Sequence, residues 1–285
     1  MDAIANILPC GERLHLQHGP IDLIIGAHGD RDAAFAAAKD RFSTVLQELV
    51  CELPDLKLPM NRDVPAPSGH IARRMDKAVR PFIDTTFVTR MASVAGSVAD
   101  TVLDAMKVAS LSRAYVNNGG DIALHLTKGQ SFTLAMADHA GIPLGRIAID
   151  YDSQIRGIAT SGRHGRSFSL GIADSVTVLA SDAARADVAA TLISNAVDLP
   201  DHHTVARRPA SSVDDTSDLG DTQVVVGCGP LGEHDKANAL TNGRSRAEEY
   251  TQRGLIAGAA LFLQGQSVTT CPAKLTIDQR TLNYA

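Results

Sequence analysis

Three short segments of the chain carry the side chains best suited to chemistry. The first, V-N-N-G-G-D-I, places Asn117, Asn118 and Asp121 around the glycines Gly119 and Gly120. Two consecutive glycines allow the backbone to turn tightly and to approach a ligand closely. An Asn-Gly pair between two apolar runs also indicates a β-hairpin. This segment alone therefore fits a hairpin turn and a ligand-binding turn equally well.

The second segment, T-S-G-R-H-G-R, follows an apolar run that is typical of a strand. Its backbone N–H groups can form an anion-binding nest. Arg163 and Arg166 can add charge-assisted hydrogen bonds to a phosphate or a carboxylate. The alternative is a solvated loop with ordinary surface arginines. Because donor groups are dense here, we favour a binding site that includes Thr160, Ser161 and Gly162.

The third segment, A-D-V-A-A-T, lies in an apolar pattern that predicts a helix. Asp187 and Thr191 are four residues apart and therefore share a helix face. Side by side on a face of small residues, their oxygens are hard ligands of the kind that Mg²⁺ prefers. The alternative is a Thr191 hydroxyl that bonds back to the carbonyl of Asp187, with the carboxylate in water. For this segment in isolation, the alternative is the better interpretation.

The composition excludes several classes of protein. Hydrophobic residues make up 44% of the 285 residues, which rules out a disordered chain. The net charge of −5, the absence of a basic tract and the lack of Trp argue against nucleic acid as a partner. We expect reduced thiols, because no metal-ligand spacing links Cys10, Cys51, Cys228 and Cys271.

The sequence also bears on membranes and cellular location. The first residues do not follow the pattern of a signal peptide, which needs a basic start before a long apolar core. The longest apolar run, residues 255–263, is far shorter than the ~20 residues that a membrane span needs. We therefore expect a soluble, cytoplasmic protein with no membrane partner.

Strands and helices must position these segments. Strand patterns occur at residues 13–16, 21–25, 114–116, 122–126, 132–136, 146–150, 155–159, 175–180, 222–227, 255–263 and 267–275. Helical patterns occur at residues 31–50 after the cap Asp30, 71–82, 91–110, 182–197 after the cap Ser181, and 233–253 with a break at Asn242 and Gly243. Because these patterns do not alternate as βαβ units, the sequence predicts an α+β fold with mixed β-sheets and packed helices.

Two stretches lack periodicity. The proline-rich residues 51–68 are expected to be a loop, and the polar residues 202–220 a long loop or flap. No linker divides the chain, so we expect a single domain over residues 1–285.

Taken together and in this order, the three segments resemble those of the ApbE-like superfamily, whose characterised members are FAD:protein FMN transferases. The match is closer to an uncharacterised, ApbE-related branch of bacterial and archaeal proteins. The matching stretches are G-P-I at residues 19–21, residues 116–124, residues 158–180 and S-D-L-G-D at residues 217–221.

The resemblance implies an ApbE-like fold and a Mg²⁺–FAD site. It places Mg²⁺ on Asp187 and Thr191, the nucleotide pocket at residues 117–121, and phosphate or substrate at residues 160–166. It also implies an acceptor protein, to which FMN would be transferred. The sequence singles out no catalytic residue.

Two departures from the transferases stand out. They carry a Lys-Gly pair where this chain has Ala95 and Gly96, and a His-Ile-Ile-Asp-Pro stretch that is missing here after Arg166. Three hypotheses follow: a Mg²⁺-dependent protein that binds a flavin nucleotide, a protein that binds or acts on a small anionic metabolite through Arg163 and Arg166 without flavin, and a non-enzymatic carrier or partner protein. A homodimer is a further expectation, because closed homo-oligomers are common.

Overall fold

The computed structural model describes residues 3–84, 86–271 and 274–277. The chain forms two compact units and passes between them several times. Unit 1 comprises Met1–Ser131, Asp150–Ala159 and Ala180–Val188, and unit 2 comprises Phe132–Ile149, Thr160–Leu179 and Ala189–Ala285. Each unit therefore gathers segments that are far apart in the sequence.

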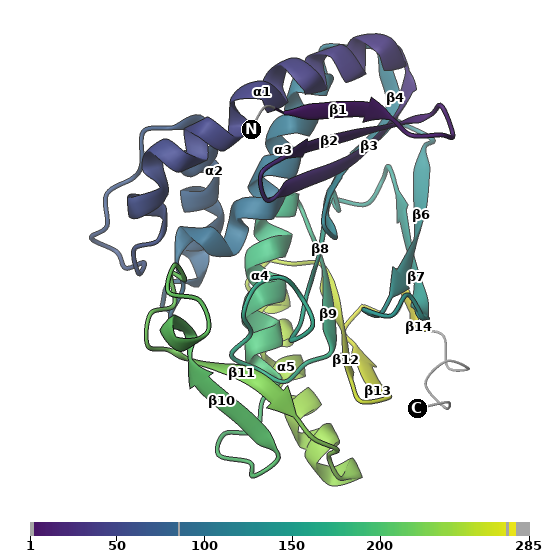
Figure 1. Ribbon diagram of the computed structural model, residues 1–285. Helices are drawn as coiled ribbons and strands as arrows, with labels where there is room; N and C mark the ends of the chain where they lie inside the picture. Colours follow the sequence, from purple (N-terminus) through teal and green to yellow (C-terminus); the bar gives the residue numbers. More distant parts are fainter. Residues whose placement is uncertain (1–2, 85, 272–273, 278–285) are drawn as a thin grey trace. The chain divides into compact units, whose positions relative to one another are not determined.

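Unit 1 is built on an antiparallel sheet with the strand order β1-β2-β3-β4-β5-β8 (Figure 1). The strands are β1 (Ile4–Ile7), β2 (Arg13–His18), β3 (Ile21–Gly29), β4 (Leu111–Asn118), β5 (Asp121–Leu126) and the first residues of β8 (Gly157–Ser161). Alternation along β2 shows how the sheet forms: Leu14 and Leu16 are buried, whereas Arg13 and Gln17 are exposed. Apolar side chains at every second position give the sheet one core-facing side.

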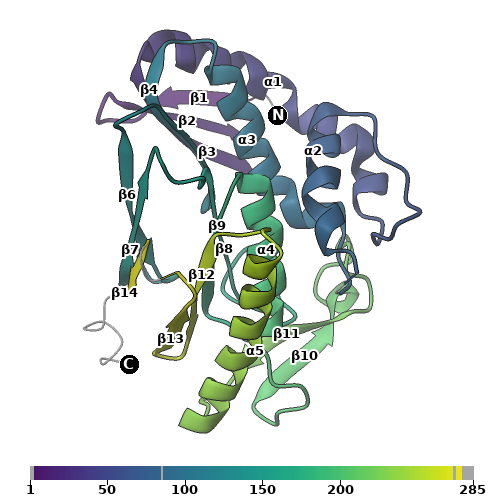
Figure 2. The same ribbon diagram turned by 180° about the vertical axis from the view of Figure 1, so that it is seen from behind.

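Helices cover this core-facing side. They are α1 (Arg31–Leu56) and α3 (Val94–Met106). Helix α2 (His70–Val79) packs against α1 and α3, together with the 3-10 helices η1 (Arg80–Phe82) and η2 (Arg90–Ser93). Phe42 of α1 and Val102 of α3 pack in one buried cluster with Leu14, Leu23 and Ile25 of the sheet. Figure 2 shows α3 lying across the sheet on this side.

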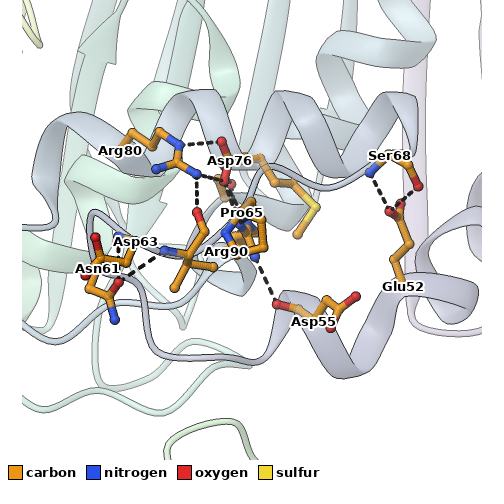
Figure 3. A network of polar contacts seen from close by, with 12 residues as sticks. Glu52, Asp55, Asn61, Asp63, Pro65, Ser68, Asp76, Arg80 and Arg90 are labelled. Atoms are coloured by element: carbon orange, nitrogen blue, oxygen red, sulfur yellow. Dashed lines mark hydrogen bonds and ion pairs between the residues drawn. The ribbon is translucent and has the colours of Figure 1, made fainter.

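A buried ionic network fastens the proline-rich stretch to α2 (Figure 3). The Arg90 side chain is 1% exposed and donates to Asp76 Oδ1 from Nε at 2.9 Å and from Nη2 at 2.7 Å. The same guanidinium donates to the carbonyls of Asp55 and Pro65. Arg80 donates to the other oxygen of Asp76 at 2.6 Å and to the carbonyl of Val64. The charges are thus paired where they are removed from water, as burial requires.

Unit 2 contains three small groups of strands. The pairs β9 (Ser175–Ala180) with β12 (Gly258–Leu263) and β12 with β13 (Gln266–Thr269) are antiparallel. The others are the set β14 (Leu275–Ile277), β7 (Pro143–Asp150) and β6 (Ser131–Ala137), and the pair β10 (Val205–Pro209) and β11 (Gln223–Cys228). Helix α5 (Glu233–Gln252) packs on β12 and β13. Helix α4 (Ala183–Ala196) begins in unit 1 and ends in unit 2, and η3 (Ala210–Ser212) follows β10.

The structure confirms the α+β class and most of the predicted elements. No described helix is long and apolar enough to cross a membrane. The strand β1 was not predicted, and it is a four-residue edge strand whose residues are all exposed. A short exposed strand carries no buried alternation, which is the signal on which strand prediction depends.

Several predicted boundaries are wrong. Residues 51–56 continue α1 instead of forming a loop, and Pro54 lies inside the helix, because Leu56 is buried in the core of unit 1. Residues 202–220 are not wholly irregular, since they contain β10, which pairs with β11. Helix α5 does not break at residue 243, where the missing side chain lets the helix pack closely on Val197 and Leu261.

Two more corrections concern ends of elements. Ser181 does not cap α4, because its hydroxyl donates to the side chain of Asp182, whose other carboxylate oxygen accepts from the amide of Arg185 at 2.8 Å. Asp182 is therefore the capping residue. The last predicted strand is two strands, β13 and β14, and residues 272–273 of the predicted range lie outside the described residues.

Candidate functional site

The Asn-Gly-Gly segment forms the turn between β4 and β5 in unit 1. Gly119 and Gly120 both have positive φ angles, 64° and 112°, which residues other than glycine rarely adopt. The Asn117 side-chain oxygen accepts from the amide of Gly120 at 2.9 Å and closes the turn. The hairpin interpretation is therefore correct for the backbone, and Asp121 is buried at the start of β5.

Asn118 connects this turn to the first turn of α3. Its side chain is buried, and its Nδ2 donates to the carbonyl of Ala95 at 3.1 Å. The position of the turn is thus fixed against the start of the helix, where the sequence departs from the Lys-Gly pair of the transferases.

Asp187, which lies on α4, contacts the same first turn of α3. The amide of Gly96 donates to Asp187 Oδ2 at 3.0 Å. The pKa of Asp187 is raised to about 7, chiefly by burial and to a smaller extent by the nearby Asp100 carboxylate, whereas the amides of Gly96 and Ala95 act to lower it. Asn118 and Asp187, which are 69 positions apart, therefore converge on the start of α3.

No counter-cation neutralises Asp187 within the described part of the chain. None of the charged groups that influence its pKa is a lysine, arginine or histidine. Within residues 3–84, 86–271 and 274–277, no cluster of three or more His, Cys, Asp and Glu side chains could hold a metal ion. A cation here would therefore depend on one carboxylate and on neutral oxygens, such as the hydroxyl of Thr191 one turn further along α4.

The Thr-Ser-Gly-Arg segment lies in unit 2, at the end of β8. The hydroxyls of Thr160 and Thr177 are hydrogen-bonded at 3.0 Å. A Cβ at Gly162 would lie 2.4 Å from the carbonyl oxygen of Asp174, so close packing requires glycine here. Ser161 is half-buried and Arg166 is exposed.

Arg163 is already paired. Its Nε and Nη2 donate to Asp174 Oδ1 at 2.9 and 2.7 Å, and its amide donates to the carbonyl of Ala173. The sequence suggested an arginine aimed at an anion, whereas the structure shows one that ties the turn to the segment before β9. The other oxygen of Asp174 accepts from the amide of Gln264 at 2.5 Å.

Sequence reasoning missed three side chains around these segments. Asp174 binds Arg163, and His139 stacks on His164 with ring centroids 4.0 Å apart. In unit 1, Asp100 is buried and lies next to the start of α4. No local pattern marks them, because each is defined by a contact with a distant part of the chain.

A family model described as "AbpE bacteria" matches residues 5–269. The chain belongs to this family. The matched range contains all three segments singled out above, so the resemblance inferred from them is confirmed.

Archaeal relatives carry the family name UPF0280. The UPF0280 protein of Methanopyrus kandleri is 33% identical over 171 residues, which cover 60% of this chain and 66% of that protein. The UPF0280 protein of Methanothermobacter thermautotrophicus is 33% identical over 190 residues, covering 66% of this chain and 69% of that protein. For a third, from Methanosarcina acetivorans, identity is 35% over 136 residues and 52% of that protein is covered. The chain thus spans from about half to about two thirds of the length of these relatives.

Two solved structures are similar in outline at low sequence identity. The apo form of the flavinyl transferase ApbE of Pseudomonas stutzeri has a TM-score of 0.47 and 12% identity, covering 100% of this chain and 99% of that one. The flavin transferase ApbE of Vibrio cholerae has a TM-score of 0.38 and 13% identity, covering 96% and 99%.

Proposed function

We propose that the protein binds a flavin nucleotide, FAD, in a Mg²⁺-dependent manner through Asp187 and the turn at residues 117–121. The observation that carries the proposal is the Asp187 carboxylate, which is partly buried, has no counter-cation among the described residues, and is held beside the Gly-Gly turn. A cation would restore the charge balance that burial disturbs.

The chemistry of the donors fits Mg²⁺. The ion prefers hard oxygen ligands and keeps some of its water. Asp187 would supply a carboxylate oxygen and Thr191 a hydroxyl oxygen, both from α4. When bound, Mg²⁺ would supply electrostatic stabilisation of the negative charge on pyrophosphate oxygens.

The other residues have positioning roles in this proposal. Asn117 holds the turn closed, and the two glycines leave its backbone accessible to a nucleotide. Asn118 keeps the turn in place against α3. The segment at residues 160–166, which belongs to unit 2, stays a prediction from the sequence as a contact for phosphate or substrate. We propose further that FMN is transferred from FAD to a hydroxyl of an acceptor protein, with cleavage of the pyrophosphate bond and AMP as the leaving group.

Calorimetric titration of metal-free protein with FAD, with and without Mg²⁺, tests the proposal. We expect micromolar binding that needs Mg²⁺ and is lost in Asp187→Asn. The matched control is Asp104→Asn, which removes an exposed carboxylate that pairs with Arg74 and Lys107 at the other end of α3. Equal FAD binding with and without Mg²⁺, or unchanged binding by Asp187→Asn, would contradict the proposal.

The flavin-free alternative has less support. It relies on Arg163 and Arg166 to bind a small anionic metabolite, and the ion pair with Asp174 already neutralises the guanidinium of Arg163. A titration with FAD that gives no heat would favour this alternative, or a role as a non-enzymatic carrier or partner protein.

A further inference from the structure

In unit 1, helices α3 and α4 each carry a carboxylate that accepts hydrogen bonds from the first turn of the other helix. Asp187 of α4 accepts from the amide of Gly96 in the first turn of α3. Asp100 of α3 accepts from the amides of Ala183 at 3.2 Å and Ala184 at 2.9 Å, in the first turn of α4. The first amides of a helix have no partner within it, and the helix dipole favours a negative charge there. Each helix therefore begins against a carboxylate of the other.

The two helix ends are also in backbone contact. A Cβ at Gly96 would lie 2.2 Å from the carbonyl oxygen of Ala183 and 2.7 Å from the amide nitrogen of Ala184. Only a residue without a side chain fits between them. Asp187 follows Ala183 by one helical turn, so a shift at the start of α4 moves Asp187 relative to α3.

The start of α4 has a second carboxylate, which makes a different contact. Asp182 accepts from the amide of Arg185 and so caps α4 from within the same segment. Asp100, which is 7% exposed, comes from another helix and has Arg74 Nη1 3.8 Å from its Oδ2. Asp100 therefore links α3 to α4, whereas Asp182 accepts from an amide of α4 only as its cap.

We propose that Asp100 is a positioning residue for the Asp187 site. By holding the amides of Ala183 and Ala184, it fixes the distance between the Asp187 carboxylate and the Ala95–Gly96 segment to which Asn118 is also bonded. The inference rests on the proposed function of Asp187 and extends it to a residue that touches neither metal nor nucleotide. Residues that orient metal ligands typically change metal affinity by about 10–100-fold when they are replaced.

The test compares Asp100→Asn with Asp182→Asn in the full chain. Asparagine has nearly the same size as aspartate, but its amide nitrogen cannot accept a hydrogen bond. Both variants remove one negative charge next to the same helix end. Mg²⁺ alone is titrated calorimetrically into metal-free protein, and hydrogen exchange of the Gly96 amide is followed by NMR without metal.

We expect Asp100→Asn to weaken Mg²⁺ binding about tenfold or more and to speed exchange of the Gly96 amide. Asp182→Asn should leave both within about twofold, because asparagine is as good a helix cap as aspartate. Unchanged Gly96 exchange in Asp100→Asn would overturn the inference, and so would an equal effect of Asp182→Asn on both measurements.

The two readouts separate this inference from the proposed function. If the wild-type protein binds no Mg²⁺, the proposed function fails, but the Gly96 amide still reports on whether Asp100 positions Asp187. If Asp100→Asn does not fold, Asp100→Glu takes its place, because it keeps the charge and displaces the carboxylate by one methylene. Faster Gly96 exchange in Asp100→Glu supports the inference, and wild-type exchange overturns it.

Discussion

At the scale of single residues, the pairing of Arg90 with Asp76 has the clearest energetic consequence. Both residues are buried, with exposures of 1% and 5%. Removing one partner leaves the other charge buried and uncompensated, which typically costs about 3–5 kcal/mol. We expect Asp76→Ala to lower the free energy of unfolding by about this amount in a urea titration.

The exposed ion pair between Arg62 and Asp84 is the matched control for that variant. Their side chains are 78% and 60% exposed. Surface pairs contribute at most about 1 kcal/mol. A loss in Asp84→Ala as large as that in Asp76→Ala would show that burial does not set the strength of the network.

The carboxylates Asp100 and Asp187 should give the metal-free protein an unusual dependence on pH. Burial raises the pKa of each from 3.8 to about 7. Between these two values the folded state binds protons that the unfolded state has released, so the free energy of unfolding falls as pH rises. We expect a decrease on the order of a few kcal/mol from about pH 4 to about pH 7, levelling off above.

Urea unfolding at a series of pH values in EDTA measures this effect. The double variant Asp100→Asn/Asp187→Asn lacks both titrating groups and should give a flatter profile over the same range. A double variant with the slope of the wild type would assign the effect to other groups.

At the scale of elements, glycines decide how closely helices pack. Alanine is better than glycine in a helix by about 1 kcal/mol. In Gly96→Ala this gain is opposed by a clash with the backbone carbonyl of Ala183, which cannot rotate away. We expect Gly96→Ala to lower the free energy of unfolding by at least about 1 kcal/mol, since overpacking typically costs 1–3 kcal/mol.

Gly243→Ala provides the comparison in unit 2. Its added methyl group would meet the side-chain atoms Val197 Cγ2 at 2.2 Å and Leu261 Cδ2 at 2.7 Å. Side chains adjust more easily than backbone, so this variant should lose less stability. Thermal unfolding of both variants checks the order, and the reverse order would contradict the argument.

The start of α4 offers a further prediction at this scale. Asp182→Ala removes the oxygen that accepts from the amide of Arg185, and loss of such a cap costs about 1 kcal/mol. Ser181→Ala should cost less than about 0.5 kcal/mol, because the hydroxyl bonds side chains and no amide of the helix. Chemical denaturation of the two variants decides which residue is the cap.

The sequence predicted elements where the pattern is local. The strands around residues 13–25 and the helix after Asp30 follow from alternation, spacing and a capping side chain. The continuation of α1 through Pro54 and the unbroken α5 at Gly243 were missed, because both depend on packing against distant residues. Tertiary contacts of this kind override local preference.

Individual residues of the candidate site could be predicted from the sequence, but the contacts that bring them together could not. Asn118 and Asp187 were singled out by residue type and spacing. Their meeting at the start of α3 could not be derived, since Gly96 and Asp187 are 91 positions apart. Asp100 gave no signal at all, because an aspartate in a helical pattern looks like an ordinary exposed residue.

At the scale of the whole molecule, ligand binding should raise the free energy of unfolding. A ligand that binds only the folded state at a hundred times its Kd adds about 2.7 kcal/mol. We therefore expect FAD with Mg²⁺ to raise the melting temperature by about 5 °C or more, whereas either one alone should do less. Differential scanning fluorimetry of wild type, Asp187→Asn and Asp104→Asn checks this, and an equal rise in Asp187→Asn would contradict it.

The interleaving of the two units in the sequence also affects when unit 1 can fold during synthesis. Ala183 belongs to the same buried cluster as Leu14, although 169 positions separate them. While the polypeptide emerges from the ribosome, the core of unit 1 stays incomplete until residues 180–188 have been made, and two segments of unit 2, Phe132–Ile149 and Thr160–Leu179, are synthesised before that point. Contacts between such distant positions form slowly and leave apolar surface exposed in the meantime. A chain cut short anywhere between residues 132 and 180 would therefore lack the start of α4 and remain a target for aggregation or degradation.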